Sequence, residues 1–211
     1  MPNPFDLDGL QIIYFGWSAF KIKTADAVLY FNPSNVGEVP EEDKADLILI
    51  GNSHDANCSE EDIQKIMKDG SKIYGPQKVE DTIGPDVLVV TGGDTYTEKG
   101  VEFNIVPAYN EGSSYNPRDF GFGFEVMIGG KKLYFAGDTD LIPGMQDRDD
   151  IDIAFLPIGG TDVMDYRDAS DSIDMIKPKY VIPMHYKVGL DSPVESFKHR
   201  VSGRAEVVVM T

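Results

Sequence analysis

The chain has 211 residues and a formal net charge of −17 at pH 7, with 36 acidic against 19 basic side chains. This charge argues against a nucleic-acid partner, whose phosphates would be repelled. The acidic residues are spread along the chain rather than gathered into a tail, so they predict a hydrated surface and name no partner.

The sequence also lacks features of membrane and secreted proteins. No apolar run approaches the roughly 20 residues that a membrane-spanning helix needs. The opening segment, MPNPFDLDGL, lacks the basic and apolar regions of a signal peptide. The single cysteine, Cys58, cannot form an internal disulfide. These features predict a cytoplasmic protein with no membrane contact.

Short runs rich in β-branched and aromatic residues recur along the chain and predict about a dozen strands. That number is too large for one small open sheet. The predicted strands cover residues 11–16, 19–24, 27–33, 46–51, 71–75, 87–91, 101–109, 121–128, 131–137, 151–158, 180–186 and 205–211.

Helical segments lie between some of these strands. Residues 59–70 begin with a capping residue, Ser59, and end at a glycine. Residues 168–178 stop at Pro178, and residues 192–203 carry a proline in the first turn and a glycine after the end. The stretches up to residue 33 and from 87 to 137 are predicted to contain strands only.

This order of elements predicts an α/β fold with two sheets between outer helices, an αββα sandwich, rather than a doubly wound parallel sheet. The hydrophobic content of 41% is enough to build a core. No linker or low-complexity segment divides the chain, so we expect one domain over residues 1–211.

Polar residues gather where several predicted strands end. The segment DLILIGNSHDANCSEEDI runs from an apolar strand through a polar turn into the capped helix. Asp138 follows the strand KLYFA, and His185 follows YVIP. Taken alone, such an Asp more often caps a turn, and such a His more often hydrogen-bonds within the core. Their combination and order favour a functional site.

In this combination the chain resembles the metallo-β-lactamase superfamily, and within it the small hydrolase-like branch related to the L-ascorbate-6-phosphate lactonases. The resemblance rests on segments that follow the family's order over nearly the full length: YFGWSAFKI, LYFNP, DLILIGNSHDANCSEEDI, VPAYN, GFGFEV, LYFAGDTD, LPIGGTDVMD and IKPKYVIPMHY. It implies an αββα sandwich of the metallo-β-lactamase type. It also implies a hydrolytic pocket in which two metal ions hold a hydroxide.

The same resemblance implies that most metal ligands have been replaced. The family pattern His-x-His-x-Asp-His and the His of a later turn fall on Asn52, His54, Ala56, Asn57 and Asn116, of which only His54 matches. An Asn amide is a weak ligand for zinc, and alanine cannot coordinate at all.

The surviving candidate ligands are His54, with Asp138 at the bridging position and His185 at the final histidine. We therefore expect no cofactor. The alternative is one weakly bound divalent ion, zinc or manganese, at these residues. No residue is assigned as catalytic.

Further residues are expected near or beside this pocket. Trp17 occupies a position that is commonly His in the branch, and Asn32 replaces a usual Asp. Asp55 is the spacer of the pattern and is expected to support the turn. Cys58 is expected to pack at the helix start rather than act as an activated thiol. His199 is expected on the surface.

The replacements favour a protein without metal-dependent hydrolase activity that acts as a binding or assembly partner. Its partner would be a small molecule or further copies of the chain. One alternative is a hydrolase or lactonase that uses a single ion on a phosphorylated or carboxylated substrate. Another is a structural paralogue that assembles with an active relative.

Overall fold

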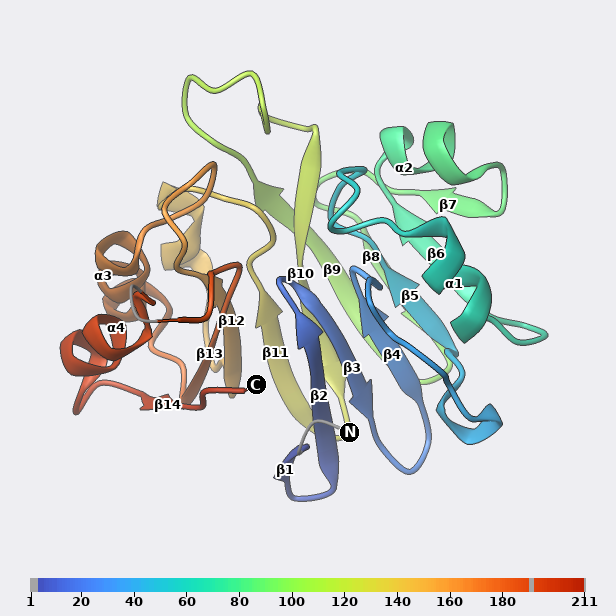
Figure 1. Cartoon of the computed structure of the whole chain (residues 1–211), viewed down its shortest axis with the longest axis horizontal. Coiled ribbons are helices and arrows are strands. Elements are labelled where there is room, and N and C mark those ends of the chain that lie inside the picture. Colours follow the sequence, from blue (N-terminus) through green and yellow to red (C-terminus); the bar gives the residue numbers. More distant parts are fainter. Residues whose placement is uncertain (1–3, 190–191, 211) are drawn as a thin grey trace.

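The computed structural model describes residues 4–189 and 192–210 and contains two sheets with helices on their outer faces (Figure 1). The first sheet has seven strands whose order in the sheet follows the chain. They are β1 (Phe5–Leu7), β2 (Leu10–Gly16), β3 (Ala19–Lys23), β4 (Val28–Phe31), β5 (Leu47–Leu49), β6 (Lys72–Gly75) and β7 (Val87–Val89).

The second sheet also has seven strands, again in chain order. They are β8 (Thr95–Glu98), β9 (Val101–Ala108), β10 (Gly121–Ile128), β11 (Lys131–Phe135), β12 (Ile153–Pro157), β13 (Tyr180–Met184) and β14 (Glu206–Val207).

The two sheets repeat one topology. In the first, β1 to β4 pair antiparallel, and β4 to β7 pair parallel. In the second, β8 to β11 pair antiparallel, and β11 to β14 pair parallel. Parallel pairs need crossover connections, and most of these connections carry the helices.

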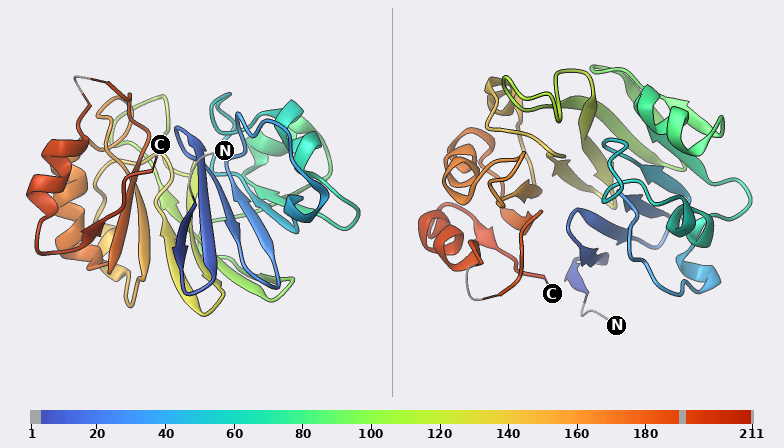
Figure 2. Two further views of the ribbon diagram at one scale, coloured as in Figure 1. Left: turned by 60° about the horizontal axis from the view of Figure 1, so that its bottom comes forward. Right: turned by 45° about the horizontal axis from the view of Figure 1, so that its top comes forward.

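Each sheet has its own helical layer, and the two layers lie on opposite sides of the molecule (Figure 2). The first sheet carries α1 (Glu60–Ile66) and α2 (Gln77–Ile83), with the 3₁₀ turn η1 (Glu41–Asp43) nearby. The second carries α3 (Tyr166–Ile176), α4 (Val194–Val201) and the 3₁₀ turn η2 (Pro143–Asp147). The predicted αββα sandwich is confirmed.

A layer of aromatic rings between the sheets forms the main core. Phe31 of β4 stacks on Phe135 of β11 with ring centroids 4.5 Å apart. Phe20 of β3 meets Phe155 of β12 edge to face at 4.8 Å. These rings come from both sheets, so their burial holds the two halves of the chain together.

Some elements differ from the sequence prediction. The strands β1 and β8 and the helix α2 were missed, since each is short and α2 follows Pro76 without a side-chain cap. The first predicted helix ends early, at Ile66. The second predicted helix begins earlier than expected, at Tyr166, because the Asp165 carboxylate accepts from the backbone N–H groups of Arg167 and Asp168. The last predicted strand shrinks to β14, and its final residue lies outside the described residues.

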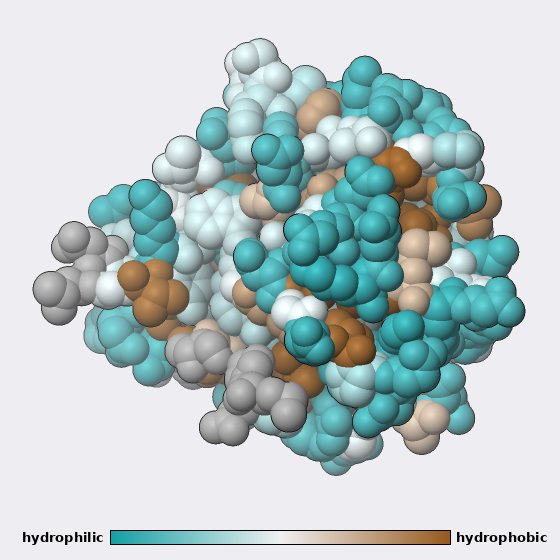
Figure 3. Space-filling model, turned by 45° about the vertical axis from the view of Figure 1, so that its right-hand side comes forward, coloured by the Kyte–Doolittle hydropathy of each residue, from teal (hydrophilic) through white to brown (hydrophobic). Residues whose placement is uncertain are grey.

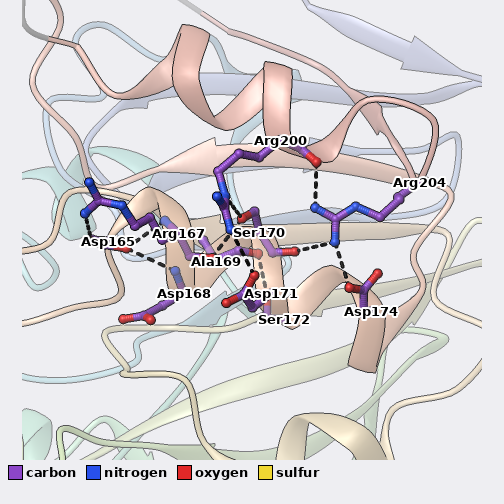
Figure 4. Close-up of polar contacts among 10 residues, drawn as sticks. All are labelled: Asp165, Arg167, Asp168, Ala169, Ser170, Asp171, Ser172, Asp174, Arg200 and Arg204. Atoms are coloured by element: carbon purple, nitrogen blue, oxygen red, sulfur yellow. Dashed lines mark hydrogen bonds and ion pairs between the residues drawn. The ribbon is translucent and has the colours of Figure 1, made fainter.

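Polar contacts join α3 to α4 (Figure 4). The Arg200 Nε donates to Ser170 Oγ at 2.7 Å, and Arg204 pairs with Asp174 at 2.9 Å. Arg204 also donates to the carbonyl oxygens of Ser170 and Arg200. These contacts fix the orientation of the two helices on the second sheet.

One face of the molecule shows how polar and apolar residues are distributed on the surface. The face turned toward the reader in Figure 3 is mostly hydrophilic, with small separate hydrophobic patches, as the net charge predicts. Within the described residues, every helix is too short or too polar to cross a membrane.

Candidate functional site

The predicted site residues lie where parallel strands end. Asn32 follows β4, and Asn52 and His54 come after β5. Asp138 follows β11, and His185 follows β13. The carboxyl ends of neighbouring parallel strands share one edge of a sheet, which is why residues far apart in sequence can meet there.

Asp138 is at the centre of a buried polar network and is only 3% exposed. Its Oδ2 accepts a hydrogen bond from Asn52 Nδ2 at 2.9 Å and another from Asn57 Nδ2 at 2.7 Å. Asn57 Nδ2 also donates to Asn52 Oδ1 at 2.8 Å. Two neutral amides at replaced ligand positions therefore solvate one oxygen of this carboxylate.

A second set of contacts fixes the orientation of the Asn57 amide. Ser18 Oγ donates to Asn57 Oδ1, and Asn32 Nδ2 donates to Ser18 Oγ at 3.1 Å. Asn32 Oδ1 in turn accepts from the backbone N–H of Gly51 at 2.7 Å. Ser18 was missed by the sequence analysis, although it directly follows Trp17 in the family-like segment YFGWSAFKI.

Asn116 supports Asp138 from another side. It is fully buried, and its Nδ2 donates to the backbone carbonyl of Asp138. Its Oδ1 has no hydrogen-bond partner among the described residues. Asn116 thus anchors the loop that carries Asp138.

His185 lies on the other side of the carboxylate. Its Nε2 is 3.7 Å from Asp138 Oδ1, which is longer than a hydrogen bond. Its ring packs against Trp17 at 4.1 Å between centroids, and its backbone N–H donates to the Trp17 carbonyl at 2.7 Å. Burial lowers the pKa of His185, against the opposing effect of the Asp138 charge, so the neutral imidazole is favoured at neutral pH.

His54 is held by aromatic stacking. Its ring lies parallel to that of Tyr115, with centroids 4.0 Å apart, and contacts Phe120 at 5.1 Å. Its Nε2 is buried and has no hydrogen-bond partner among the described residues.

The residual ligands do not assemble into a metal site. Within residues 4–189 and 192–210, no three His, Cys, Asp or Glu side chains are arranged to hold an ion. The predicted trio of His54, Asp138 and His185 is therefore not such a group. Ala56 offers no donor, and the Asn57 amide turns its N–H toward the carboxylate. The side chains present do not fit a dinuclear centre.

The remaining candidates have structural or surface positions. Asp55 is exposed and makes no side-chain hydrogen bond within the described part of the chain. His199 is exposed on α4. Burial, aided by the charges of Asp55 and Glu60, raises the pKa of the Cys58 thiol to about 11, which disfavours an activated thiolate.

A cavity of about 640 Å³ opens beside the network. This volume is in the range of small-molecule sites. Asp138 and His185 lie in its wall together with Trp17, His54, Ala56, Asn57, Tyr115, Gly159, Thr161, Asp162, Tyr186, Lys187, Val188, Gly189, Ser192 and Pro193.

Comparison with known proteins identifies the family to which this chain belongs. A model of the β-lactamase superfamily domain matches residues 11–185, which is more than half of the chain. The chain belongs to the metallo-β-lactamase superfamily.

Curated relatives place the chain in a named family of that superfamily. A UPF0173 metal-dependent hydrolase of Thermococcus onnurineus is 31% identical over 219 residues, covering 95% of this chain and 96% of the relative. Another, from Thermoplasma acidophilum, is 34% identical over 193 residues, covering 85% and 84%. The chain is thus a member of the UPF0173 metal-dependent hydrolase family.

Solved structures agree on the metallo-β-lactamase fold. A Parabacteroides distasonis protein assigned as a metal-dependent hydrolase has a TM-score of 0.86 at 26% identity, over 99% of this chain and 97% of that one. The metallo hydrolase Igni18 of Ignicoccus hospitalis has a TM-score of 0.78 at 24% identity, over 95% and 94%.

The Gly159 backbone contacts the backbone of His185 at the cavity wall. A Cβ added at Gly159 would lie 2.2 Å from the His185 carbonyl oxygen. We expect Gly159→Ala to displace His185 and to lower the free energy of unfolding by about 1–3 kcal/mol, measured by urea denaturation. Gly144→Ala is the control, because its added Cβ would meet no described atom within 4 Å. Equal effects of the two changes would contradict this account.

Proposed function

We propose that this chain is a small-molecule-binding member of the UPF0173 family whose cavity works without a dinuclear metal centre. The observation that supports this proposal is the pair of amide donors, Asn52 and Asn57, on one oxygen of Asp138. In the family resemblance, this Asp bridges the two metals and both Asn positions carry metal ligands. Here the same positions supply neutral hydrogen-bond donors.

The hydrogen bonds of the network support a carboxylate that is compensated at one of its oxygens without a metal ion. A buried carboxylate is costly unless hydrogen bonds or positive charge compensate it. Asn52 and Asn57 provide that compensation at Oδ2, and Ser18 orients the Asn57 amide. To bind metal at these positions, the chain would have to break these hydrogen bonds and gain only weak amide oxygen ligands.

A hydrolase is the second candidate, and family membership favours it more than it favours the binding role. The relatives bear the name metal-dependent hydrolase. In this chain His54, Asp138 and His185 are the side chains that would have to hold a single ion, which would supply an activated water. A lactonase acting on a phosphorylated or carboxylated substrate would match the resemblance to the ascorbate-phosphate lactonase branch.

Metal content separates the two candidates. We expect protein purified without chelator to carry well under one equivalent of zinc, manganese or iron, because the lost ligands leave each ion with too few donors. Elemental analysis measures this, with the Thermoplasma acidophilum relative purified in parallel as the control. Turnover of generic phosphodiester and lactone substrates is assayed beside it. One or two equivalents that survive dialysis, together with turnover, would establish the hydrolase instead.

Binding to further copies of the same chain is the other form that the binding function could take. Its measurement is the molar mass in solution, by light scattering, with and without the small molecules tested below.

A further inference from the structure

The carboxylate of Asp138 has one solvated oxygen and one unpartnered oxygen. Oδ2 accepts from two amides, whereas Oδ1 is buried and has no hydrogen-bond partner among the described residues. His185 Nε2 is the neighbour at 3.7 Å. Asp138 also lies in the cavity wall. A ligand in this cavity that displaces the side chains covering Oδ1 would satisfy this oxygen by donating a hydrogen bond.

Negative charge gathers around the same cavity. Asp162 shares its wall with Asp138. The pKa of the Tyr115 hydroxyl is raised by burial and further by the charges of Asp138, Asp162 and Asp55, so these carboxylates act on one region. Among the described wall residues, Lys187 is the one lysine or arginine, and it is exposed to solvent. The enclosed part of the cavity thus favours positive charge.

Aromatic rings line part of the wall. Trp17 packs on His185, and Tyr115 stacks on His54, which places two aromatic pairs in the cavity wall. Aromatic faces attract organic cations and cover their apolar bodies. A compact hydrated metal ion makes little use of such walls.

We propose that the cavity binds an organic cation with N–H donors, a primary ammonium or an amidinium on a small apolar body, with its cationic head on Oδ1 of Asp138. This inference rests on the proposed metal-independent binding function and names its ligand class. The cationic head replaces the charge of the lost metals at the carboxylate. The aromatic rings Trp17 and Tyr115 receive the apolar body.

Calorimetric titration with matched probes tests the ligand class. The probes are benzylammonium and benzamidinium, with benzyl alcohol as the neutral control and benzoate as the anionic control, in buffer with chelator. We expect the two cations to bind at least about tenfold more tightly than the alcohol, and benzoate not to bind, because a charge-assisted hydrogen bond is about twice as strong as a neutral one. Benzoate binding as tightly as the cations, or no binding of either cation, would overturn the proposal.

Variants locate the interaction. Asp138→Asn should weaken cation binding at least about tenfold, whereas Glu102→Gln, which removes an exposed charge on β9, should leave it unchanged. Ala56→Leu keeps the carboxylate and places a larger side chain in the cavity from an exposed loop position, so it should also weaken cation binding. This variant provides the test if Asp138→Asn does not fold. Full cation affinity in either folded cavity variant would refute the placement.

The metal analysis of protein purified without chelator shows whether a failed titration also rules out the proposed function. If the protein carries no metal and binds benzoate or benzyl alcohol rather than the cations, the proposed binding function stands, and the organic-cation ligand class is excluded. If the protein carries metal and turns over ester or phosphodiester substrates, both the metal-independent binding function and the organic-cation ligand class are excluded.

Discussion

The variant with Asn52→His, Ala56→Asp, Asn57→His and Asn116→His is expected to bind about two equivalents of zinc, where the parent binds well under one. The structure places the side chains of Asn52, Asn57 and Asn116 in direct contact with Asp138, and Ala56 in the cavity wall. Imidazoles and a carboxylate introduced there would surround the carboxylate that bridges the metals in the family.

Elemental analysis after dialysis measures the stoichiometry. The single replacements serve as controls and should each bind far less metal than the fourfold variant, because each ion would remain short of ligands. Metal binding alone is not expected to restore hydrolysis. Trp17 in the cavity wall and Asn32 beside the polar network still differ from the family pattern, and such neighbours orient the metal ligands. A folded fourfold variant that binds no more zinc than the parent would show that these positions are not the old ligand set.

Much of the fold could be predicted because its signals are local. Apolar runs such as those of β5, β11 and β12 are buried along most of their length, and they were found at nearly the correct bounds. The missed elements carry weaker signals. β8 alternates exposed and partly exposed residues, and α2 buries only Val79. Their formation depends on pairing and packing partners that are distant in the sequence.

The candidate site was only partly predictable for a related reason. The resemblance pointed to Asn52, Asn57 and Asp138 as neighbours, but not to the direction in which the amides would turn. Ser18 orients the Asn57 amide, and a serine beside a tryptophan gives no sequence signal for this contact. The separate stacking of His54 on Tyr115 depends on the loop between β9 and β10. Such contacts require the three-dimensional fold.

The amide network should be important for stability as well as for binding. Asn57→Leu is expected to lower the free energy of unfolding by about 2–4 kcal/mol, because it leaves a buried carboxylate with one donor fewer and removes an acceptor from Ser18. Urea denaturation in chelator measures the change. Asn104→Leu is the matched control, since this half-exposed residue of β9 accepts one bond from Thr95 and should change stability by less than about 1 kcal/mol.

A double-mutant cycle shows whether the Asp138 charge causes this loss. Asp138→Asn removes the charge but keeps an oxygen that can accept from Asn52, so adding Asn57→Leu in that background no longer deprives a carboxylate of a donor. We therefore expect the double variant to be more stable than the sum of the two single changes predicts, by about 1 kcal/mol or more. Simple additivity within about 0.5 kcal/mol would mean that Asn57 acts through packing alone. The carboxylate would then be compensated elsewhere, and the amide pair would lose its role as the substitute for the metals.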